Sequence, residues 1–252
     1  MNQRQVSNKR QNTFPGFTLI ELMLAMSFIS VLLITIALSI IQLGTIYNRG
    51  MALKEINQSS RDISDDLRRT LETSGVFSIN ADGSDSSDRV TVRHGSEVVG
   101  GRLCLGAYSY VWNYQYAQDN NLPGLTRIGV DGDPVDFVKV PDVGRQFCAK
   151  SGSGLLRENL STADATRLTE LLSSGDRELG IQRFSVSSQP TAEDPVTGKK
   201  LYTFTYTLGT GDTIAMNSDQ SACLEPDQPN ANLTYCNVQT FTIALTAGNG
   251  VN

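Results

Sequence analysis

The stretch Gly16-Phe17-Thr18-Leu19-Ile20-Glu21 is the most informative part of this 252-residue sequence, because an uncharged apolar run over residues 22–41 follows it directly. The run contains neither glycine nor proline, and its polar residues are Ser27, Ser30, Thr35 and Ser39. A helix rises about 1.5 Å per residue, so a run of this length would span the roughly 30 Å hydrocarbon core of a bilayer. We therefore expect a transmembrane helix, with the carboxylate of Glu21 near one end in need of a partner.

These residues resemble the class III signal of the type IV pilin and pseudopilin superfamily, in which a short basic leader and a Gly-Phe-Thr-Leu-Ile-Glu motif precede an apolar helix. The resemblance implies that a prepilin peptidase cleaves between Gly16 and Phe17 and that the new amino group of Phe17 is methylated. It also implies that Glu21 acts in assembly by pairing with the Phe17 amine of a neighbouring subunit. A glycine at the cleavage site would let a protease approach the backbone closely.

The residues before the motif carry only positive charges, on Arg4, Lys9 and Arg10. Positive residues flanking a transmembrane helix favour the cytoplasmic side, so we expect the N-terminus inside and the chain beyond about residue 45 outside. We divide the N-terminal part into a leader peptide (1–16) and a transmembrane and filament-core helix (17–44). A conventional secretory signal peptide is the alternative, which the long apolar run, the acidic Glu21 and the lack of an A-x-A site disfavour.

The charge balance is acidic. The formal net charge is -5, and without the leader's three cations 18 basic residues remain against 26 acidic ones, which gives -8. Nucleic-acid binding needs clustered lysine and arginine to contact phosphates. We therefore do not expect nucleic acid as a partner of the domain as a whole.

Four cysteines, Cys104, Cys148, Cys223 and Cys236, all follow the apolar run. An even number of cysteines in an oxidising compartment indicates disulfides, with three connectivities available. We favour Cys104–Cys148 and Cys223–Cys236, because each pair is local and brackets a turn-rich stretch. A zinc site is the alternative, but no C-x-x-C occurs and His94 is the only histidine.

The helix is expected to continue beyond the membrane as an amphipathic segment over residues 45–75, ending at Gly75 as a C-cap. Its apolar residues recur at helical spacing and form one stripe, which needs a sheet to cover it: Ile46, Leu53, Ile56, Ile63, Leu67 and Leu71. We expect an α+β fold in which a long N-terminal α-helix packs on an antiparallel β-sheet domain (76–252), extracytoplasmic and closed by a disulfide-bounded C-terminal loop.

Within this domain the pattern predicts strands at 76–80, 89–93, 102–105, 108–116, 135–140, 179–187, 200–208 and 239–246. A short helix is predicted at 161–173, with Ser161 or Thr162 as its N-cap.

Aromatic residues alternate along the predicted strand 108–116, at Tyr108, Tyr110, Trp112, Tyr114 and Tyr116. Tyr110, Trp112 and Tyr114 could form a ligand surface for sugars or single-stranded nucleic acid. Such a row is more often one buried face of a sheet, here against the helix stripe, and we favour that interpretation.

The sequence contains no recognisable catalytic motif, and its acidic loops lack the EF-hand spacing, so we expect no enzyme activity, no cofactor and no metal. The size of the domain and the long insertion at about 100–160 resemble a minor pilin, or the J-type pseudopilin of type II secretion. A pilus-tip adhesin or DNA-capture module is the other alternative.

The resemblance implies a single-pass protein of the cytoplasmic membrane that later enters an extracellular pilus or pseudopilus. Its expected partners are major and minor pilins, the prepilin peptidase/N-methyltransferase, the inner-membrane assembly platform, membrane lipid before assembly, and a ligand if it sits at a tip.

Overall fold

The computed structural model describes residues 16–80, 84–152, 154–172, 178–211, 213–232 and 234–248. The predicted leader therefore lies outside the described residues, except for Gly16. The chain forms two compact units, residues 1–46 and residues 47–252. The described part combines one long N-terminal helix with antiparallel sheets, which confirms the α+β class predicted from the sequence.

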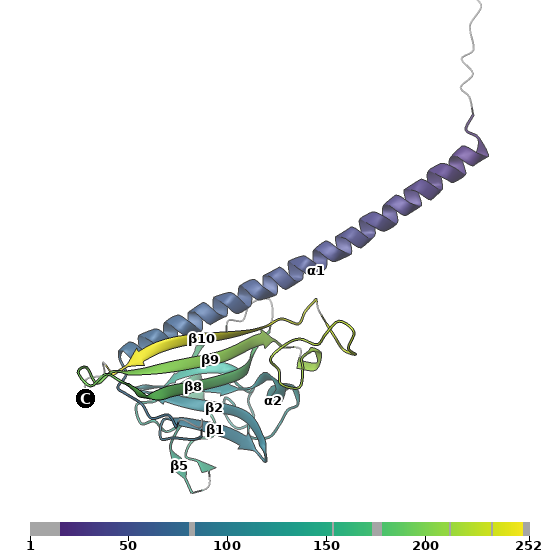
Figure 1. The fold of residues 1–252 in the computed structure, drawn as a ribbon. Helices are drawn as coiled ribbons and strands as arrows, with labels where there is room; N and C mark the ends of the chain where they lie inside the picture. The colour runs from purple at the N-terminus through teal and green to yellow at the C-terminus, as the bar shows by residue number, and fades with distance from the viewer. Residues whose placement is uncertain are drawn as a thin grey trace, which may run out of the picture. The chain divides into compact units, whose positions relative to one another are not determined.

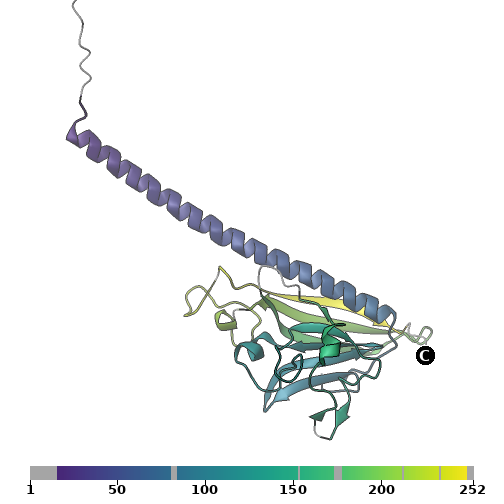
Figure 2. The same ribbon diagram turned by 180° about the vertical axis from the view of Figure 1, so that it is seen from behind.

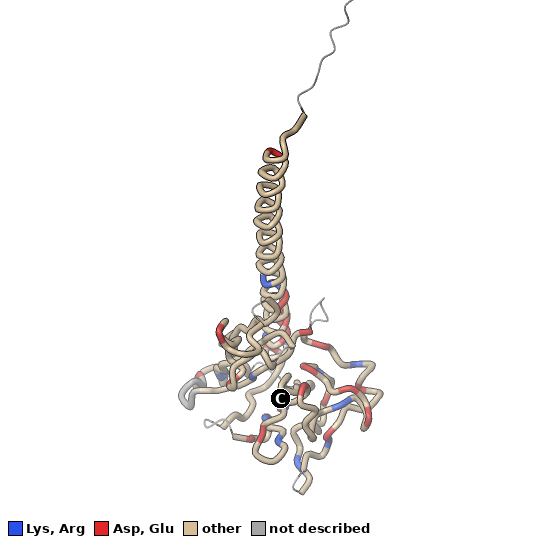
Figure 3. The backbone as a smooth tube through the Cα atoms, turned by 90° about the vertical axis from the view of Figure 1, so that its right-hand side faces the viewer, with Lys and Arg blue, Asp and Glu red and all other residues tan. Residues whose placement is uncertain are grey.

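Helix α1 (Leu19–Glu72) contributes to both units. In the first unit, the large apolar side chains of the 22–41 run are 43–68 % exposed. The mean hydropathy reaches 2.6 in this helix, which is long and apolar enough to cross a membrane. Figure 3 shows that the N-terminal half of the helix is almost free of charged residues.

The second unit contains two larger sheets, in which all neighbouring strands are antiparallel. The five-stranded sheet has the order β1 (Arg89–His94), β2 (Glu97–Leu105), β3 (Tyr108–Asn113), β4 (Phe137–Pro141) and β7 (Thr169–Glu170). The three-stranded sheet has the order β10 (Val238–Ala247), β9 (Lys200–Thr210) and β8 (Leu179–Glu193). A small hairpin pairs β5 (Lys150–Ser151) with β6 (Gly154–Leu155). Figures 1 and 2 show β8, β9 and β10 side by side next to the C-terminal half of α1.

The core of this unit lies where the C-terminal half of α1 meets both sheets. Ile56, Ile63, Leu67 and Leu71 are fully buried there, among aromatic side chains of β3, β4, β8 and β9. The predicted stripe is therefore right in its C-terminal part. It is wrong at its start, because the side chains of Ile46 and Leu53 remain exposed.

Tyrosine hydroxyl groups fix the helix to the sheets. The Tyr206 hydroxyl lies 2.9 Å from both the Ser60 and the Ser64 hydroxyls and also donates to the Ser60 carbonyl. The Tyr110 hydroxyl donates to Asp66 Oδ2 at 2.6 Å and lies within hydrogen-bond distance of the Thr70 hydroxyl, at 2.7 Å. Burial, and then the hydrogen bond to Asp66, raise the pKa of Tyr110 above its ordinary value. These contacts determine which turns of α1 face the sheets.

The helix ends at Glu72, before the predicted C-cap at Gly75. Gly75 does not adopt a positive φ. Instead, the hydroxyls of Thr73 and Ser74 donate to the Thr70 carbonyl at 3.0 and 2.6 Å and satisfy one of the last acceptors of the helix.

The strand predicted at 76–80 is wrong, because side chains rather than a neighbouring strand satisfy its backbone. The Tyr202 hydroxyl accepts a hydrogen bond from Phe77 N–H and donates one to the Phe77 carbonyl. Asp88 accepts from the Ser78 N–H at 2.7 Å, and the Ser86 hydroxyl donates to the Ser78 carbonyl.

The predicted strand 108–116 is too long, since β3 ends at Asn113 and α2 (Gln115–Asp119) follows. The buried Asn113 amide donates to the carbonyls of Thr126 and Val135 and accepts from the Thr126 N–H. This side chain anchors the loop before β4, and the ladder stops at the same point.

The helix predicted at 161–173 is only one turn, α3 (Thr162–Ala165), although Ser161 is its N-cap as predicted. Ser173 lies outside the described residues. The chain leaves the helix because Thr169 and Glu170 pair with β4 as strand β7, and the Leu171 N–H then donates to the Phe137 carbonyl.

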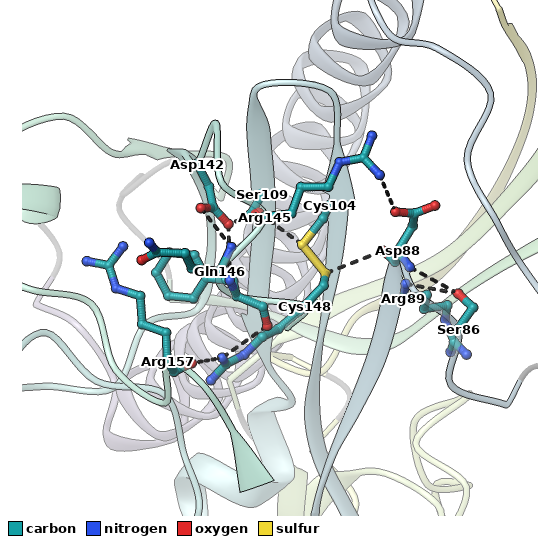
Figure 4. The surroundings of a disulfide bond; sticks show 12 residues. Ser86, Asp88, Arg89, Cys104, Ser109, Asp142, Arg145, Gln146, Cys148 and Arg157 are labelled. Carbon is teal, nitrogen blue, oxygen red and sulfur yellow. Dashed lines mark hydrogen bonds and ion pairs between the residues drawn. A yellow bond between two sulfur atoms is a disulfide. The ribbon is translucent and has the colours of Figure 1, made fainter. Parts of the chain in front are cut away.

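Both favoured disulfides, Cys104–Cys148 and Cys223–Cys236, are present. The first connects β2 to the segment after β4 (Figure 4). Beside it, the buried Asp142 carboxylate accepts hydrogen bonds from the Ser109 hydroxyl and from the backbone N–H groups of Gln146 and Phe147. This network holds the chain that carries Cys148 against the sheet.

Replacing Tyr206 with phenylalanine should lower the free energy of unfolding of the 47–252 unit by about 1–2 kcal/mol, because the Ser60 and Ser64 hydroxyls lose a shared partner. The measurement is denaturant unfolding of the full-length protein in detergent, followed by fluorescence of the single tryptophan, Trp112. Tyr108→Phe is the matched control at a more exposed ring and should change stability by less than about 0.5 kcal/mol. Equal losses in the two variants would contradict the role of the Tyr206 hydroxyl.

Candidate functional site

The candidate site is the start of helix α1, which the residues of the motif themselves define. Thr18 precedes the first helical residue, and its carbonyl accepts from the Leu22 N–H at 3.2 Å. The Thr18 hydroxyl accepts from the Glu21 N–H at 3.3 Å, and the Glu21 carboxylate accepts from the Thr18 N–H at 3.0 Å. This reciprocal arrangement is a capping box, in which Thr18 is the N-cap and Glu21 the third helical residue.

The capping role of Thr18 and Glu21 was not predicted, although the sequence contains the signal for it. Thr18-Leu19-Ile20-Glu21 fits the pattern [ST]-x-x-[DE] before an apolar run, which is typical of a capping box. The sequence-based prediction for Glu21 is a carboxylate that pairs with another subunit, with contact to lipid headgroups as the alternative. The structure shows that it has a partner within its own first turn.

Only one of the two oxygens of the Glu21 carboxylate takes part in this cap. The Thr18 hydroxyl and the Thr18 N–H both donate to Oε2, at 2.8 and 3.0 Å. Oε1 has no partner among the residues that the structure describes. A carboxylate in the first turn also interacts favourably with the positive end of the helix dipole. The group is therefore held in a fixed place while one oxygen remains available to another donor.

The polar side chains within the apolar run are satisfied by the helix itself. Each hydroxyl donates to a backbone carbonyl one turn earlier, at 2.7–2.9 Å: Ser27 to Leu24, Ser30 to Met26, Thr35 to Leu32 and Ser39 to Thr35. A hydroxyl in hydrocarbon needs such a partner because no water is present to provide one. The surface of the run is thus compatible with lipid or with other apolar helices along its whole length.

Gly16 and Phe17, predicted at the cleavage site, lie before the helix and are exposed. The Phe17 ring is 83 % exposed, and a Cβ added at Gly16 would meet no atom within 4 Å. In the described chain, the peptide bond between them is therefore open to another protein.

The aromatic residues predicted as an alternative ligand surface lie elsewhere, and two of them are in the core. Tyr110 and Trp112 are 0 % and 1 % exposed. Trp112 packs on Phe184 of the other sheet, with ring centroids 4.5 Å apart. An exposed surface made by these two residues is therefore wrong, and the favoured core interpretation is confirmed for them. Tyr114 is half-buried, and its hydroxyl donates to the Phe184 carbonyl.

Comparison of the chain with known protein families, curated proteins and solved structures found no match.

Replacing Thr18 with valine should unfold the first turn of α1, because valine keeps the shape of threonine but loses the hydroxyl that closes the capping box. We expect a local loss of about 1 kcal/mol. It would appear as a shift of the backbone carbon resonances of residues 19–22 toward coil values, in the full-length protein in detergent. Thr35→Val removes a hydroxyl that bonds only within the helix interior and should leave these resonances unchanged. Unchanged resonances in Thr18→Val would show that the cap does not hold the helix start.

Proposed function

We propose that this protein is a minor pilin-like structural subunit. Its helix anchors it in the cytoplasmic membrane and later packs against the helices of other subunits in a filament. The observation that carries the proposal is the combination of an exposed apolar helix, hydroxyls satisfied internally, and one carboxylate fixed at its first turn. The motif around the Gly16–Phe17 bond supports maturation by a prepilin peptidase/N-methyltransferase.

The driving force for assembly is the exchange of lipid contacts for helix–helix contacts. The apolar side chains of the run are exposed, so both environments can cover them. Lipid tails are as apolar as leucine, so tight packing between helices must provide the gain. Ala25, Ser27 and Ser30 are small and allow close approach of a second helix.

Glu21 sets the register between subunits in this mechanism. Cleavage after Gly16 creates a cationic amine at Phe17, and an amine or a carboxylate alone is costly to bury in an apolar bundle. The free Oε1 of Glu21 can accept a hydrogen bond from the Phe17 amine of a neighbour, while Oε2 keeps the capping box closed. One carboxylate thus maintains its own helix start and compensates the charge of another subunit.

The proposed orientation of the protein across the membrane rests on the basic leader and on the cysteines. The basic leader favours the cytoplasm, and the two disulfides of the 47–252 unit need an oxidising compartment to form. The partners in this proposal are other pilins, the processing enzyme, the inner-membrane assembly platform and, before assembly, lipid. The 47–252 unit would lie on the outside of the helix bundle.

Glu21→Gln tests the charge separately from the cap. Glutamine can still close a capping box, so the helix start and membrane insertion should be retained. Without the negative charge, the amine of the neighbour is left uncompensated, and we expect incorporation into filaments to fall at least about tenfold. The measurement is the ratio of filament-bound to membrane-bound protein after shearing of the cells that produce it.

Glu72→Gln is the matched control at the exposed C-terminal end of the same helix and should assemble as the parent does. Assembly of Glu21→Gln at the parental level would contradict the proposed charge pairing.

A further inference from the structure

A groove of about 640 Å³ lies within the 47–252 unit, which is a size typical of small-molecule sites. Strands β1, β2, β3 and β8 and a turn after β9 contribute to it. Its charged and polar lining residues include Arg89, Arg93, Glu97, Gln182, Arg183 and Asp219. Neither the helix start nor the apolar run contributes to this groove.

Two irregularities of strand register lie beside this groove. The register of β1 against β2 shifts between Val92 and Arg93, and that of β8 against β9 shifts between Ile181 and Arg183. Gln182 is thereby the extra residue of β8. Bulges bend the strand and re-aim side chains, and they often occur beside functional sites.

Buried polar groups without partners line the groove. Gln182 is 2 % exposed, and neither its amide nitrogen nor its amide oxygen has a hydrogen-bond partner in the described structure. The indole N–H of the buried Trp112 also lacks one there. Burying such groups unpaired is costly, so they indicate a missing partner. Gly101 permits the indole to lie against β2, because a Cβ at this position would come within 2.4 Å of the Trp112 ring.

The groove is locally basic in an acidic protein. Arg93 and Arg183 are exposed on two different strands, and Arg89 lies beside them in the lining. Guanidinium groups bind carboxylates with paired, charge-assisted hydrogen bonds. Two carboxylates, Glu97 and Asp219, also border the groove, so its polar lining offers acceptors as well as donors.

An aromatic pair supplies an apolar wall. The rings of Tyr114 and Tyr116 are stacked, with centroids 6.2 Å apart and planes inclined by 17°. Their hydroxyls are already used, since Tyr114 donates to the Phe184 carbonyl and Tyr116 to the Val98 carbonyl. The rings of these residues, rather than their hydroxyls, are therefore available to a ligand, and they suit the apolar face of a sugar.

A disulfide holds the remaining wall, the turn at residues 218–220. Met216 pairs with Cys223 across the base of this turn, and Cys223 is bonded to Cys236. Within it, the Asn217 side chain accepts from the Ser221 N–H, and the Gln220 N–H donates to the Asn217 carbonyl. These local contacts and the disulfide hold the wall that carries Asp219.

We propose that this groove binds an acidic sugar unit of a glycan. The arginines hold its carboxylate, the Gln182 amide and the flanking carboxylates bond its hydroxyls, and the tyrosine rings cover its apolar face. Hydroxyl groups both donate and accept, which matches a lining with both kinds of partner. A nucleic acid would need a row of cations along its phosphates, and Glu97 and Asp219 would oppose it.

The test is calorimetric titration of the full-length protein in detergent with 3′-sialyllactose and with trigalacturonic acid. Lactose and the methyl ester of trigalacturonic acid are the neutral controls, and an oligothymidine is the polyanion control. We expect at least one acidic sugar to bind about tenfold more tightly than its neutral counterpart, since carboxylate–arginine contacts are charge-assisted. Absence of binding by both acidic sugars, equal binding of the neutral sugars, or tighter binding of the oligothymidine would overturn the proposal.

Variants locate the site. Arg183→Ala should weaken binding of the acidic sugar about tenfold. The exposed Arg68→Ala on α1 makes the same change of charge elsewhere and should leave it unchanged. Gln182→Met removes the unpaired amide with little change of volume, so it should weaken binding without lowering the unfolding midpoint in denaturant. Parental binding by both groove variants would overturn the assignment of the groove.

Discussion

Hydroxyl groups of two buried tyrosines fix the C-terminal part of the long helix against the sheets. Tyr206 contacts Ser60 and Ser64, and Tyr110 contacts Asp66 and Thr70, so the turns of α1 from Ser60 to Thr70 are fixed against the sheets. The buried residues of this 54-residue helix begin at Ala52. Polar pairs in a core have strict geometry, and the helix cannot slide to bury more of its apolar length without breaking them. The apolar surface upstream of this contact therefore needs another environment.

Polar atoms without a partner in the described chain occur at two places, the start of helix α1 and the groove. In the helix, each hydroxyl of the apolar run is satisfied, and Oε1 of Glu21 has no partner among the described residues. In the groove, Gln182 and Trp112 carry polar atoms without partners among the described residues. Unsatisfied groups in apolar surroundings are costly, so each points to a partner outside the described part of the chain. We propose another subunit as the partner of Glu21 and an acidic sugar as the ligand of the groove.

The sequence predicted those parts of the fold that depend on local pattern. The apolar run, most of the helix stripe, the C-terminal strands and both disulfides follow from periodicity and spacing along the chain. The sequence did not predict the places where a side chain distant along the chain determines whether a strand forms or where it ends. Asn113 ends β3 by binding the loop before β4, and Tyr202 holds Phe77 without any strand at 76–80. The groove was not predictable, because Arg93 and Arg183 come from strands of two different sheets and line it only once the sheets pack together.

We propose that Phe17 becomes the first residue of a subunit whose helix then packs with others. Mass spectrometry of the N-terminal peptide, from protein purified out of the cells that produce it, shows whether the chain begins there. We expect a peptide that begins at Phe17 and is heavier than the unmodified sequence by one methyl group on its amine. A peptide that still contains residues 1–16 would contradict the claim and leave a membrane-anchored domain with a groove.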